Sequence, residues 1–563
     1  MFAEKRKISN VAKNILKKRY FSDNETSWED IINRVINNVV PKWSKKDKQN
    51  MFDLINNTYF VPNSPCLVNA GKKSGGLCAC FVLDFPDTIE DIFKTKLNFA
   101  LIARKGGGCG TSLTKIRPEG SSVAGSTHGY AGGPLKFANT ISHDANAMTQ
   151  SGFRSMAIMF TESIYHPDII KFITSKTTEG MISNANMSVV VDNNFMKAVE
   201  NNEKFWTEFN GEKYKQYDAK TIFDLIIEGM WHNGEPGLLF QDRIDDSPYK
   251  YTGQKIFGTN PCSEQPLPSN GVCNLGSLDL SKFLDKNGNL EFEKLEIATR
   301  LGIRFLDEVI NATNFPTEDI EKWAKENRAV GLGIMGYADY CLMKKMAYGS
   351  DESLEELESI LSFINKMAED ESIIQGKKLG IPKMCAMLPN PRRNITLLTV
   401  APTGTCSLIA GCSSGIEPIF SEITVRNDKT GTYTFENNLA SQPYFRCAVS
   451  SNGSQEVTWE EHVKVLSSAQ KYIDSGVSKT INFPTKTRRE TIGKAAMMAW
   501  KMDCKGVAMY RNGSRKTEVL SPKNIKRDLC PICGNEMVFL DEKLKCTQCT
   551  KEDIYEKATG SYD

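Results

Sequence analysis

Three prolines within one stretch constrain this chain more than any other feature. The stretch runs from Gly258 to Ser277 and reads GTNPCSEQPLPSNGVCNLGS. Pro261, Pro266 and Pro268 exclude a helix there, because proline lacks a backbone N–H and restricts the residue before it. The sequence therefore predicts a stiff loop with extended segments.

The same stretch carries reactive side chains at a spacing of two. Asn260, Cys262 and Glu264 are each two residues apart, and in an extended segment this spacing places side chains on one face. An amide, a thiol and a carboxylate are then expected to point into one pocket, where the carboxylate is a competent base for chemistry on an alcohol. The alternative is that Cys262 is a small buried residue in a proline-rich turn, as most free cysteines are.

NPCSEQPLP followed by CNLGS resembles the active-site finger loop of ribonucleotide reductases, which usually reads NPCGEQPL; Ser263 replaces the glycine. The resemblance implies an α/β fold, a ten-stranded barrel of two antiparallel five-stranded halves with the finger loop through its centre. It also implies replacement of the ribose 2′-hydroxyl by hydrogen. In that reaction Cys262 becomes a thiyl radical and takes the 3′ hydrogen, Glu264 accepts the 3′-hydroxyl proton, and Asn260 hydrogen-bonds the substrate.

Two further cysteines complete the implied reaction. GGLCACFVLDF reads as a buried strand with Cys78 and Cys80 on one face, and the family has one cysteine directly before FVL, at the position of Cys80. By the resemblance, Cys80 and Cys273 supply two electrons and close to a disulfide. Cys78 is an extra thiol, which either packs in the core or exchanges with that disulfide.

Two segments resemble the substrate site of the family. FVPNSPCLVNAG is similar to PNSPTLMNAG and implies that Ser64 hydrogen-bonds the nucleotide. TVAPTGTCSLIAGCSSGIEPIF reads as a strand, a turn and a short apolar run, and backbone N–H groups at a turn before a helix bind anions. The family reads APTGTxSxIAGxSSGIEP there and uses the turn for substrate phosphates, although an ordinary strand-to-helix turn would look the same. The implied phosphate-binding residues are Thr403, Gly404, Thr405, Cys406 and Ser407.

Glycine-rich loops flank a predicted helix, LKFANTISHDANAM. They do not form a P-loop, because no Gly-Lys-Ser/Thr closes them. In the family this helix and the loops at its ends bind an allosteric deoxynucleotide, and the loops correspond to residues near 117–133 and 150–157. The second loop reads SGFRSMA and diverges from the usual GGRRRGA. The expected effector residues are Arg117, Ser151, Gly152 and Arg154.

The source of the radical divides the family into classes. Where the oxygen-dependent class I has two adjacent tyrosines, this chain reads AMYRNGSR with one, Tyr510, and no glycyl-radical motif is visible. YRxGSR followed by a cysteine-rich tail resembles class II, which implies adenosylcobalamin as the cofactor. The alternative is the α subunit of a class I enzyme, which needs a separate metal-radical subunit.

The C-terminal segment holds two CxxC pairs separated by twelve residues. This spacing is typical of a zinc ribbon, but CxxC pairs also shuttle disulfides. If the pairs bind zinc, thioredoxin or a similar reductant is expected to reduce the Cys80–Cys273 disulfide. The predicted zinc ligands are Cys530, Cys533, Cys546 and Cys549.

Composition limits the possible partners. The net charge of +2 over 563 residues does not favour a nucleic-acid or membrane partner, which argues against a nucleic-acid-binding protein built on the zinc ribbon. No apolar leader follows MFAEKRKISN and no run of about 18 apolar residues occurs, so a cytoplasmic enzyme with mostly reduced cysteines is expected. The family implies a ribonucleotide substrate, a deoxynucleotide or ATP effector, and a homodimer.

The expected domain organisation follows from these motifs. The parts are an N-terminal helical segment without an ATP cone (1–50), the catalytic barrel (51–515), a linker (516–529), a four-cysteine module (530–549) and a tail (550–563).

Overall fold

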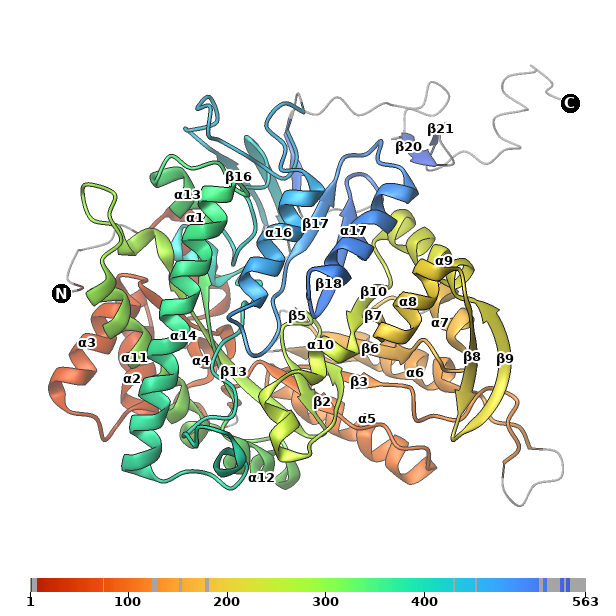
Figure 1. Cartoon of the computed structure of the whole chain (residues 1–563). Helices are drawn as coiled ribbons and strands as arrows, with labels where there is room; N and C mark the ends of the chain where they lie inside the picture. Colours follow the sequence, from red (N-terminus) through yellow and green to blue (C-terminus); the bar gives the residue numbers. More distant parts are fainter. Residues whose placement is uncertain are drawn as a thin grey trace, which may run out of the picture.

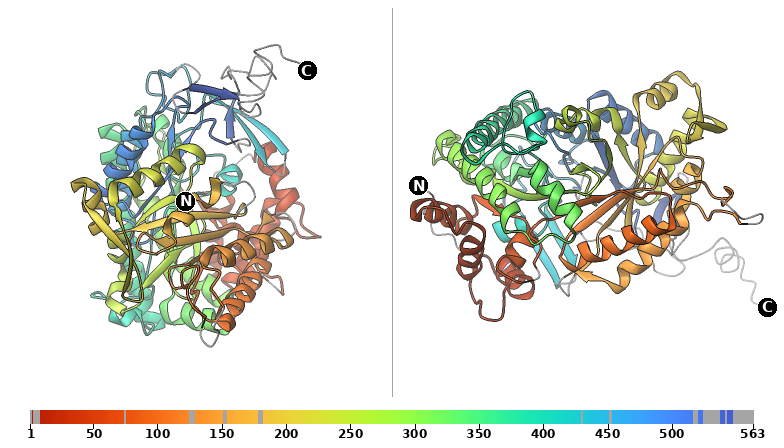
Figure 2. Two further views of the ribbon diagram at one scale, coloured as in Figure 1. Left: turned by 90° about the vertical axis from the view of Figure 1, so that its right-hand side faces the viewer. Right: turned by 90° about the horizontal axis from the view of Figure 1, so that it is seen from below.

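The computed structural model describes most of the chain. The described residues are 2, 8–73, 75–123, 129–150, 154–177, 182–428, 431–450, 453–515, 520–523, 537–540 and 543–546. Figure 1 shows strands in the middle of the molecule with helices around them, and Figure 2 shows the same arrangement from the side and from below.

The α-helices of the described residues are as follows. They are α1 (Asn10–Arg19), α2 (Trp28–Val39), α3 (Lys45–Asn56), α4 (Ser64–Asn69), α5 (Ile89–Arg104), α6 (Pro134–Ala147), α7 (Ile169–Thr174), α8 (Asn193–Asn201), α9 (Ala219–Asn233), α10 (Gln241–Asp245), α11 (Phe292–Ala312), α12 (Glu318–Asn327), α13 (Tyr337–Met343), α14 (Asp351–Leu379), α15 (Cys406–Ala410), α16 (Trp459–Gln470) and α17 (Arg489–Lys501).

The strands fall into one large sheet and several small ones. They are β1 (Phe60–Pro62), β2 (Cys80–Leu83), β3 (Gly108–Ser112), β4 (Thr149–Gln150), β5 (Arg154–Ser155), β6 (Ile158–Ser163), β7 (Ala185–Val191), β8 (Lys204–Phe209), β9 (Glu212–Asp218), β10 (Gly237–Phe240), β11 (Ile256–Thr259), β12 (Pro266–Pro268), β13 (Gly271–Asp279), β14 (Val330–Met335), β15 (Ile423–Asp428), β16 (Gly431–Glu436), β17 (Thr480–Phe483), β18 (Gly506–Arg511), β19 (Leu520–Pro522), β20 (Met537–Leu540) and β21 (Lys543–Cys546).

Serine caps begin each of the first three helices. The hydroxyl groups of Ser9, Ser27 and Ser44 accept hydrogen bonds from backbone N–H groups of the first turn, and Asp30 completes a capping box in α2. The apolar residues Ile32, Val35, Ile36 and Val39 of α2 are all buried. The predicted helical start of the chain is therefore observed, and α3 carries it to Asn56.

Ten of the strands belong to one sheet built in two halves. In the first half β2, β3, β6, β7 and β10 run parallel, each paired with the next, and a helix follows each strand, as parallel pairing requires. In the second half β13 is parallel to β14, and β17 is parallel to β18. The halves meet antiparallel, β13 against β2 and β18 against β10.

Residues 398–400 close this sheet. Leu398 pairs with Leu332 of β14, and Val400 pairs with Val477, just before β17. The ladder therefore continues from β14 through this segment to β17 and returns through β18 to the first half. A closed ring of strands has no open edge, and the two-part barrel expected from the sequence is observed.

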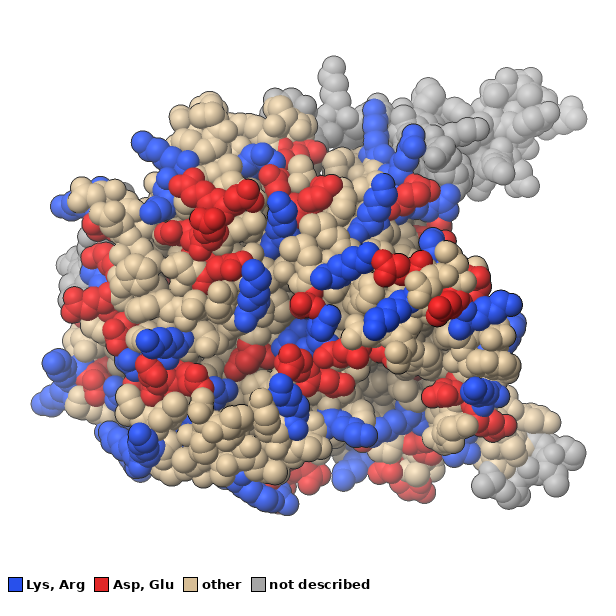
Figure 3. All heavy atoms as spheres, in the orientation of Figure 1, with Lys and Arg blue, Asp and Glu red and all other residues tan. Residues whose placement is uncertain are grey.

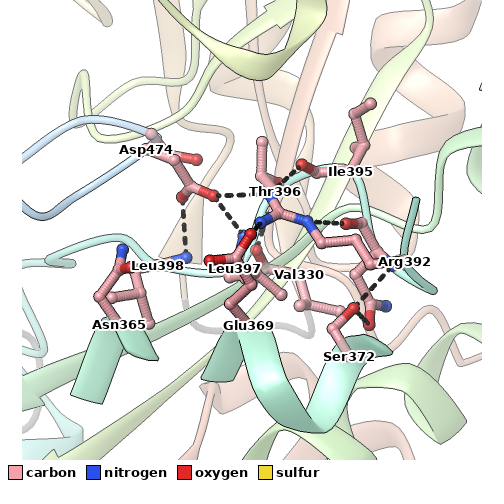
Figure 4. A network of polar contacts seen from close by, with 12 residues as sticks. Val330, Asn365, Glu369, Ser372, Arg392, Ile395, Thr396, Leu397, Leu398 and Asp474 are labelled. Atoms are coloured by element: carbon pink, nitrogen blue, oxygen red, sulfur yellow. Dashed lines mark hydrogen bonds and ion pairs between the residues drawn. The ribbon is translucent and has the colours of Figure 1, made fainter. Parts of the chain in front are cut away.

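A buried polar network holds the closing segment (Figure 4). The carboxylate oxygens of Asp474 accept hydrogen bonds from the backbone N–H groups of Leu397 and Leu398, each at 2.8 Å. The guanidinium group of Arg392 lies 3.6 Å from Asp474 and 3.2 Å from Glu369. The carboxylate of Asp474 thus links the closing segment to the chain that leads into β17.

The C-terminal end of the described chain is a small hairpin of β20 and β21. Three of the predicted zinc ligands, Cys530, Cys533 and Cys549, lie outside the described residues, and Cys546 is described only as the last residue of β21. The zinc site therefore stays a prediction.

Two surface properties can be stated for the described part. None of its helices is both long and apolar enough to cross a lipid bilayer. Figure 3 shows basic and acidic side chains mixed over one face of the molecule, in keeping with the 70 basic and 68 acidic residues of the whole chain.

Replacing Asp474 with Ala is expected to lower the free energy of unfolding by about 2–4 kcal/mol, because two backbone N–H groups and Arg392 lose a buried acceptor. Denaturant unfolding followed by circular dichroism measures the change. Lys464→Ala is the control, since Lys464 lies 3.9 Å from the highly exposed Asp351 and such pairs contribute at most about 1 kcal/mol. Equal losses in both variants would contradict the role of Asp474 in closing the barrel.

Candidate functional site

A hairpin of β11 and β12 lies against the barrel strands β2, β3 and β6. Its close approach requires glycine in β3, because a Cβ atom on Gly110 would lie 1.8 Å from the carbonyl oxygen of Thr259. The hairpin comes from the proline-rich stretch, and Pro266 and Pro268 are the ends of β12. The predicted stiff loop is therefore a hairpin seated on the barrel strands.

The tip of the hairpin is a tight turn rather than the extended segment predicted from the spacing. Asn260 bonds across it to Gln265 twice: its side-chain oxygen accepts the Gln265 N–H at 2.9 Å, and its own N–H donates to the Gln265 carbonyl at 3.2 Å. Ser263 has a φ of 65°, a left-handed conformation that glycine adopts without strain. The expectation of an extended tip was thus wrong, because the residue at 263 must turn the chain.

The tip nevertheless brings the predicted side chains together. The Asn260 side-chain amide donates to the Cys80 sulfur at 3.1 Å, and the Cys80 thiol lies 3.8 Å from the Glu264 carboxylate. Cys273 is the direct cross-strand partner of Cys80. Cys262 is only partly buried and lines the adjoining cavity. We call these five residues the thiol cluster: Cys80, Asn260, Cys262, Glu264 and Cys273.

Burial controls the protonation of two thiols in this cluster. Burial raises the pKa of Cys80 well above its usual value, and the neighbouring Glu264 carboxylate raises it further. Burial likewise raises the pKa of Cys273. Both thiols therefore stay protonated near neutral pH and keep the hydrogen atoms that a reductive step consumes.

Three residues that the sequence did not single out hold the tip. Thr399 donates its hydroxyl hydrogen to the Glu264 carbonyl at 2.8 Å, and the Gly476 N–H donates to the same oxygen at 2.8 Å. Asn186 of β7 donates to the Pro261 carbonyl at 2.8 Å. Glycine is required at 476, because a Cβ atom there would lie 2.7 Å from the Ser263 oxygen.

A cavity of about 970 Å³ extends from Cys262 across the barrel. It is lined by residues of both halves, among them Asn186, Ser407, Glu417 and Tyr510. Ligand pockets of this kind measure about 300–1,000 Å³. The cavity therefore offers a nucleotide-sized space beside Cys262, and Ser407 of the predicted phosphate turn is among its lining residues.

The predicted phosphate turn, residues 403–407, is held in a strained shape. Thr403 has a φ of 49°, which is costly for a β-branched residue. Its hydroxyl oxygen accepts the Gly415 N–H at 2.9 Å, and the hydroxyl groups of Ser407 and Ser414 lie 2.8 Å apart. The turn does lead into a helix, as predicted, but α15 has only five residues.

Ser64 lies beside this turn. Its hydroxyl oxygen is 3.9 Å from the Cys406 sulfur and 2.7 Å from the hydroxyl oxygen of Tyr20. Tyr20 follows α1, and α1 packs against α15. The N-terminal helices thus support the predicted substrate site, a contact that no sequence pattern signalled.

The predicted effector residues are only partly described. Arg117 forms an ion pair with Asp87 at 2.7 Å. Ser151 and Gly152 lie outside the described residues, and Arg154 is described only by its backbone in β5, which pairs with β4. An effector site at these loops stays a prediction.

The described side chains do not gather into a metal centre. In that part of the chain no group of three or more His, Cys, Asp or Glu residues is arranged to hold a metal ion. The described site therefore consists of the thiol cluster and the neutral turn, of which Cys262 and Ser407 line the cavity.

Two family models match the chain. Ribonucleotide reductase, barrel domain, matches residues 78–384, 387–442 and 436–510, and ribonucleotide reductase, all-alpha domain, matches residues 6–75. The vitamin B12-dependent ribonucleoside-diphosphate reductase of Thermoplasma acidophilum is 39% identical over 82% of this chain, which covers 65% of that protein. The protein of the same name from Mycobacterium tuberculosis is 31% identical over 92% of this chain, which covers 81% of it.

Alkylation is expected to separate the thiols of the cluster. At pH 8 iodoacetamide should modify Cys262 at least about tenfold faster than Cys80 and Cys273, because raised pKa values leave these two almost without reactive thiolate. Peptide mass spectrometry after timed quenching measures the rates. In denaturant the three rates should converge. Equal rates in the folded protein would contradict the protonated state of the two buried thiols.

Proposed function

Because this chain belongs to the ribonucleotide reductase family, we propose that it converts ribonucleotides into 2′-deoxyribonucleotides and that adenosylcobalamin starts the reaction. The names of the relatives at 39% and 31% identity support this cofactor. The observation that carries the proposal is that Asn260 and Glu264 both contact the Cys80 thiol at the hairpin tip, while Cys262 of the same tip lines the cavity. An amide, a base and a redox pair around one thiol are the groups that this chemistry uses.

The roles of the cluster follow from its chemistry. The Cys262 thiyl radical takes the hydrogen atom from C3′ of the ribose, Glu264 accepts the proton of the 3′-hydroxyl group, and Asn260 hydrogen-bonds the substrate. The 2′-hydroxyl group leaves as water. Cys80 and Cys273 then give up two electrons and two protons and form a disulfide, so one ribonucleotide and two thiols yield one deoxyribonucleotide, one water and one disulfide.

The cross-strand register of Cys80 and Cys273 supports this pairing. Directly opposite residues of antiparallel strands have Cα atoms about 4.5–5.5 Å apart, and disulfides span Cα separations of about 4.4–6.8 Å. The two cysteines can therefore bond without a large movement of the backbone. Each turnover leaves this pair as a disulfide, so a separate dithiol must reduce it, and thioredoxin or the C-terminal cysteines are the proposed reductants.

Part of the cavity wall is apolar and could pack against the face of a cofactor ring. Met159, Met187, Leu238 and Met509 line it together with the thiol, and these flexible or branched side chains suit the face of a corrin ring. When bound, adenosylcobalamin supplies a radical through homolysis of its weak cobalt–carbon bond. These four residues would hold it beside Cys262, whose thiol hydrogen is the one removed.

The class I alternative requires a radical path from a second subunit. The described β18 supplies one tyrosine to the cavity, Tyr510, where class I chains carry an adjacent pair. The relatives named for vitamin B12 favour the cobalamin-dependent class. The α subunit of a class I enzyme is therefore the second candidate.

The proposed domain organisation follows the motifs of the sequence. We assign residues 1–50 to a helical segment, 51–515 to the catalytic barrel, 516–529 to a linker, 530–549 to a zinc-binding or redox module and 550–563 to a tail. A deoxynucleotide or ATP is the proposed effector at the loops near Arg117.

An exposed apolar face on α5 supports a homodimer. Ile89, Phe93 and Leu97 are 55%, 57% and 58% exposed, and residues four apart lie on one face of a helix. Contiguous exposed apolar surface of this kind marks an interaction site. We therefore place the proposed dimer contact at α5.

The protein with adenosylcobalamin and dithiothreitol should reduce at least one of ADP, CDP, GDP and UDP, measured as deoxynucleotide by chromatography. Cys262→Ala should lower turnover by at least about 10³-fold, since it removes the reacting atom. Cys447→Ala is the control, because Cys447 is buried in a separate small cluster with Leu342 and Phe445. Full turnover by Cys262→Ala would contradict the mechanism, and turnover that requires an added metal-radical subunit would support class I.

The variant Phe93→Glu is expected to shift the protein from dimer to monomer, because a buried unpaired charge at an interface costs several kcal/mol. Light scattering after gel filtration measures the mass. Ile374→Glu is the matched control, since Ile374 is 50% exposed on α14 and should leave the mass unchanged. A monomeric unmodified protein would refute the α5 contact.

A further inference from the structure

The predicted phosphate turn has no charge of its own. Its five residues, 403–407, are neutral, while a nucleoside diphosphate carries several negative charges. The helix that follows, α15, has only five residues, too few to supply a strong macrodipole. A cation from another part of the chain would strengthen the binding of a diphosphate there.

The four cationic side chains that line the cavity among the described residues differ in the groups they contact. The Lys479 ammonium group forms an ion pair with Glu417 at 2.9 Å, and the Lys505 ammonium group donates to the carbonyl of Ser475 at 2.9 Å. Among the described residues that line the cavity, only Arg426 has a cationic group bonded to the turn. The cationic side chains of that lining are Arg426, Lys479, Lys505 and Arg515.

Arg426 is placed by a small sheet that borders the cavity. The sheet consists of β16, β15 and β19, and Arg426 of β15 is paired with Tyr433 and Leu520. Its guanidinium group donates to the Gly404 carbonyl at 3.4 Å. A hydrogen bond of this length is weak, so the contact contributes little to stability, while it puts the cation directly at the turn.

Gly404 leaves space beside that cation. A Cβ atom built on Gly404 would meet no other atom within 4 Å, so packing does not require glycine at this position. Its φ is not in the left-handed range either. A glycine that neither packing nor turn geometry demands lets a ligand approach the backbone closely.

From these contacts we propose that Arg426 binds the terminal phosphate of the nucleoside diphosphate substrate, next to Gly404. This proposal rests on the proposed function and names a further binding residue for it. The planar guanidinium group can hold two phosphate oxygens at once, which a lysine ammonium group cannot do. Partial burial strengthens the attraction, because water screens it less than at the surface.

The test compares Arg426→Gln and Arg426→Lys with the unmodified protein. We expect Arg426→Gln to raise the KM and the Kd for CDP by about 10–100-fold with kcat nearly unchanged, because a charged contact to a distal phosphate acts in binding and not in the radical steps. Arg426→Lys should give KM and Kd values between those of the other two proteins, since lysine keeps the positive charge but cannot hold two phosphate oxygens at once. Affinity for CMP, which lacks the terminal phosphate, should change by less than about threefold.

Arg446→Gln is the matched control. Arg446 is also a partly buried arginine, but it pairs with Glu461 at 2.7 Å and does not line the described cavity, so it should leave the KM for CDP unchanged. An unchanged Kd for CDP in Arg426→Gln would overturn the proposal, as would equal losses for CDP and CMP. If the unmodified protein binds CDP but does not reduce it, the proposed function fails, and a weaker Kd for CDP in Arg426→Gln would still support the Arg426 contact. No CDP binding at all overturns both.

Discussion

The position of the reactive thiol depends on one carbonyl group, that of Glu264. Its oxygen accepts hydrogen bonds from the Thr399 hydroxyl and from the Gly476 N–H, and both donors belong to the segments through which the barrel closes. The hairpin tip is therefore fixed by the closure itself. A barrel that closed differently would also move Cys262, Glu264 and the cavity they border.

The sequence identified the reactive residue types of the candidate site but not the backbone conformation that holds them. The spacing of Asn260, Cys262 and Glu264 predicted side chains on one face of an extended segment, whereas the structure has a turn there and places Asn260 and Glu264 beside the Cys80 thiol. Ser263 shows why: its left-handed φ is a property of the folded tip, and serine gives no signal for it, whereas the usual glycine would. The helical start was predictable, because caps and apolar spacing are local.

Contacts between distant segments were not predictable. Tyr20 meets Ser64, and Arg426 meets Gly404, only because helices and strands far apart in the chain pack side by side. Neither Tyr20 nor Arg426 lies in a motif, so no spacing rule marks it. The same holds for Asp474, whose carboxylate joins two segments of the closing region.

The order of the strands also determines when an active molecule can exist. Neighbouring strands β10 and β18, or β2 and β13, are separated by most of a domain along the chain, so the barrel cannot close until β18 has left the ribosome. During synthesis, Cys80, Cys262 and Cys273 emerge long before the segments that bury or fix them. Folding through such distant pairings is slow, so these cysteines are open to wrong disulfides until the last strand is in place.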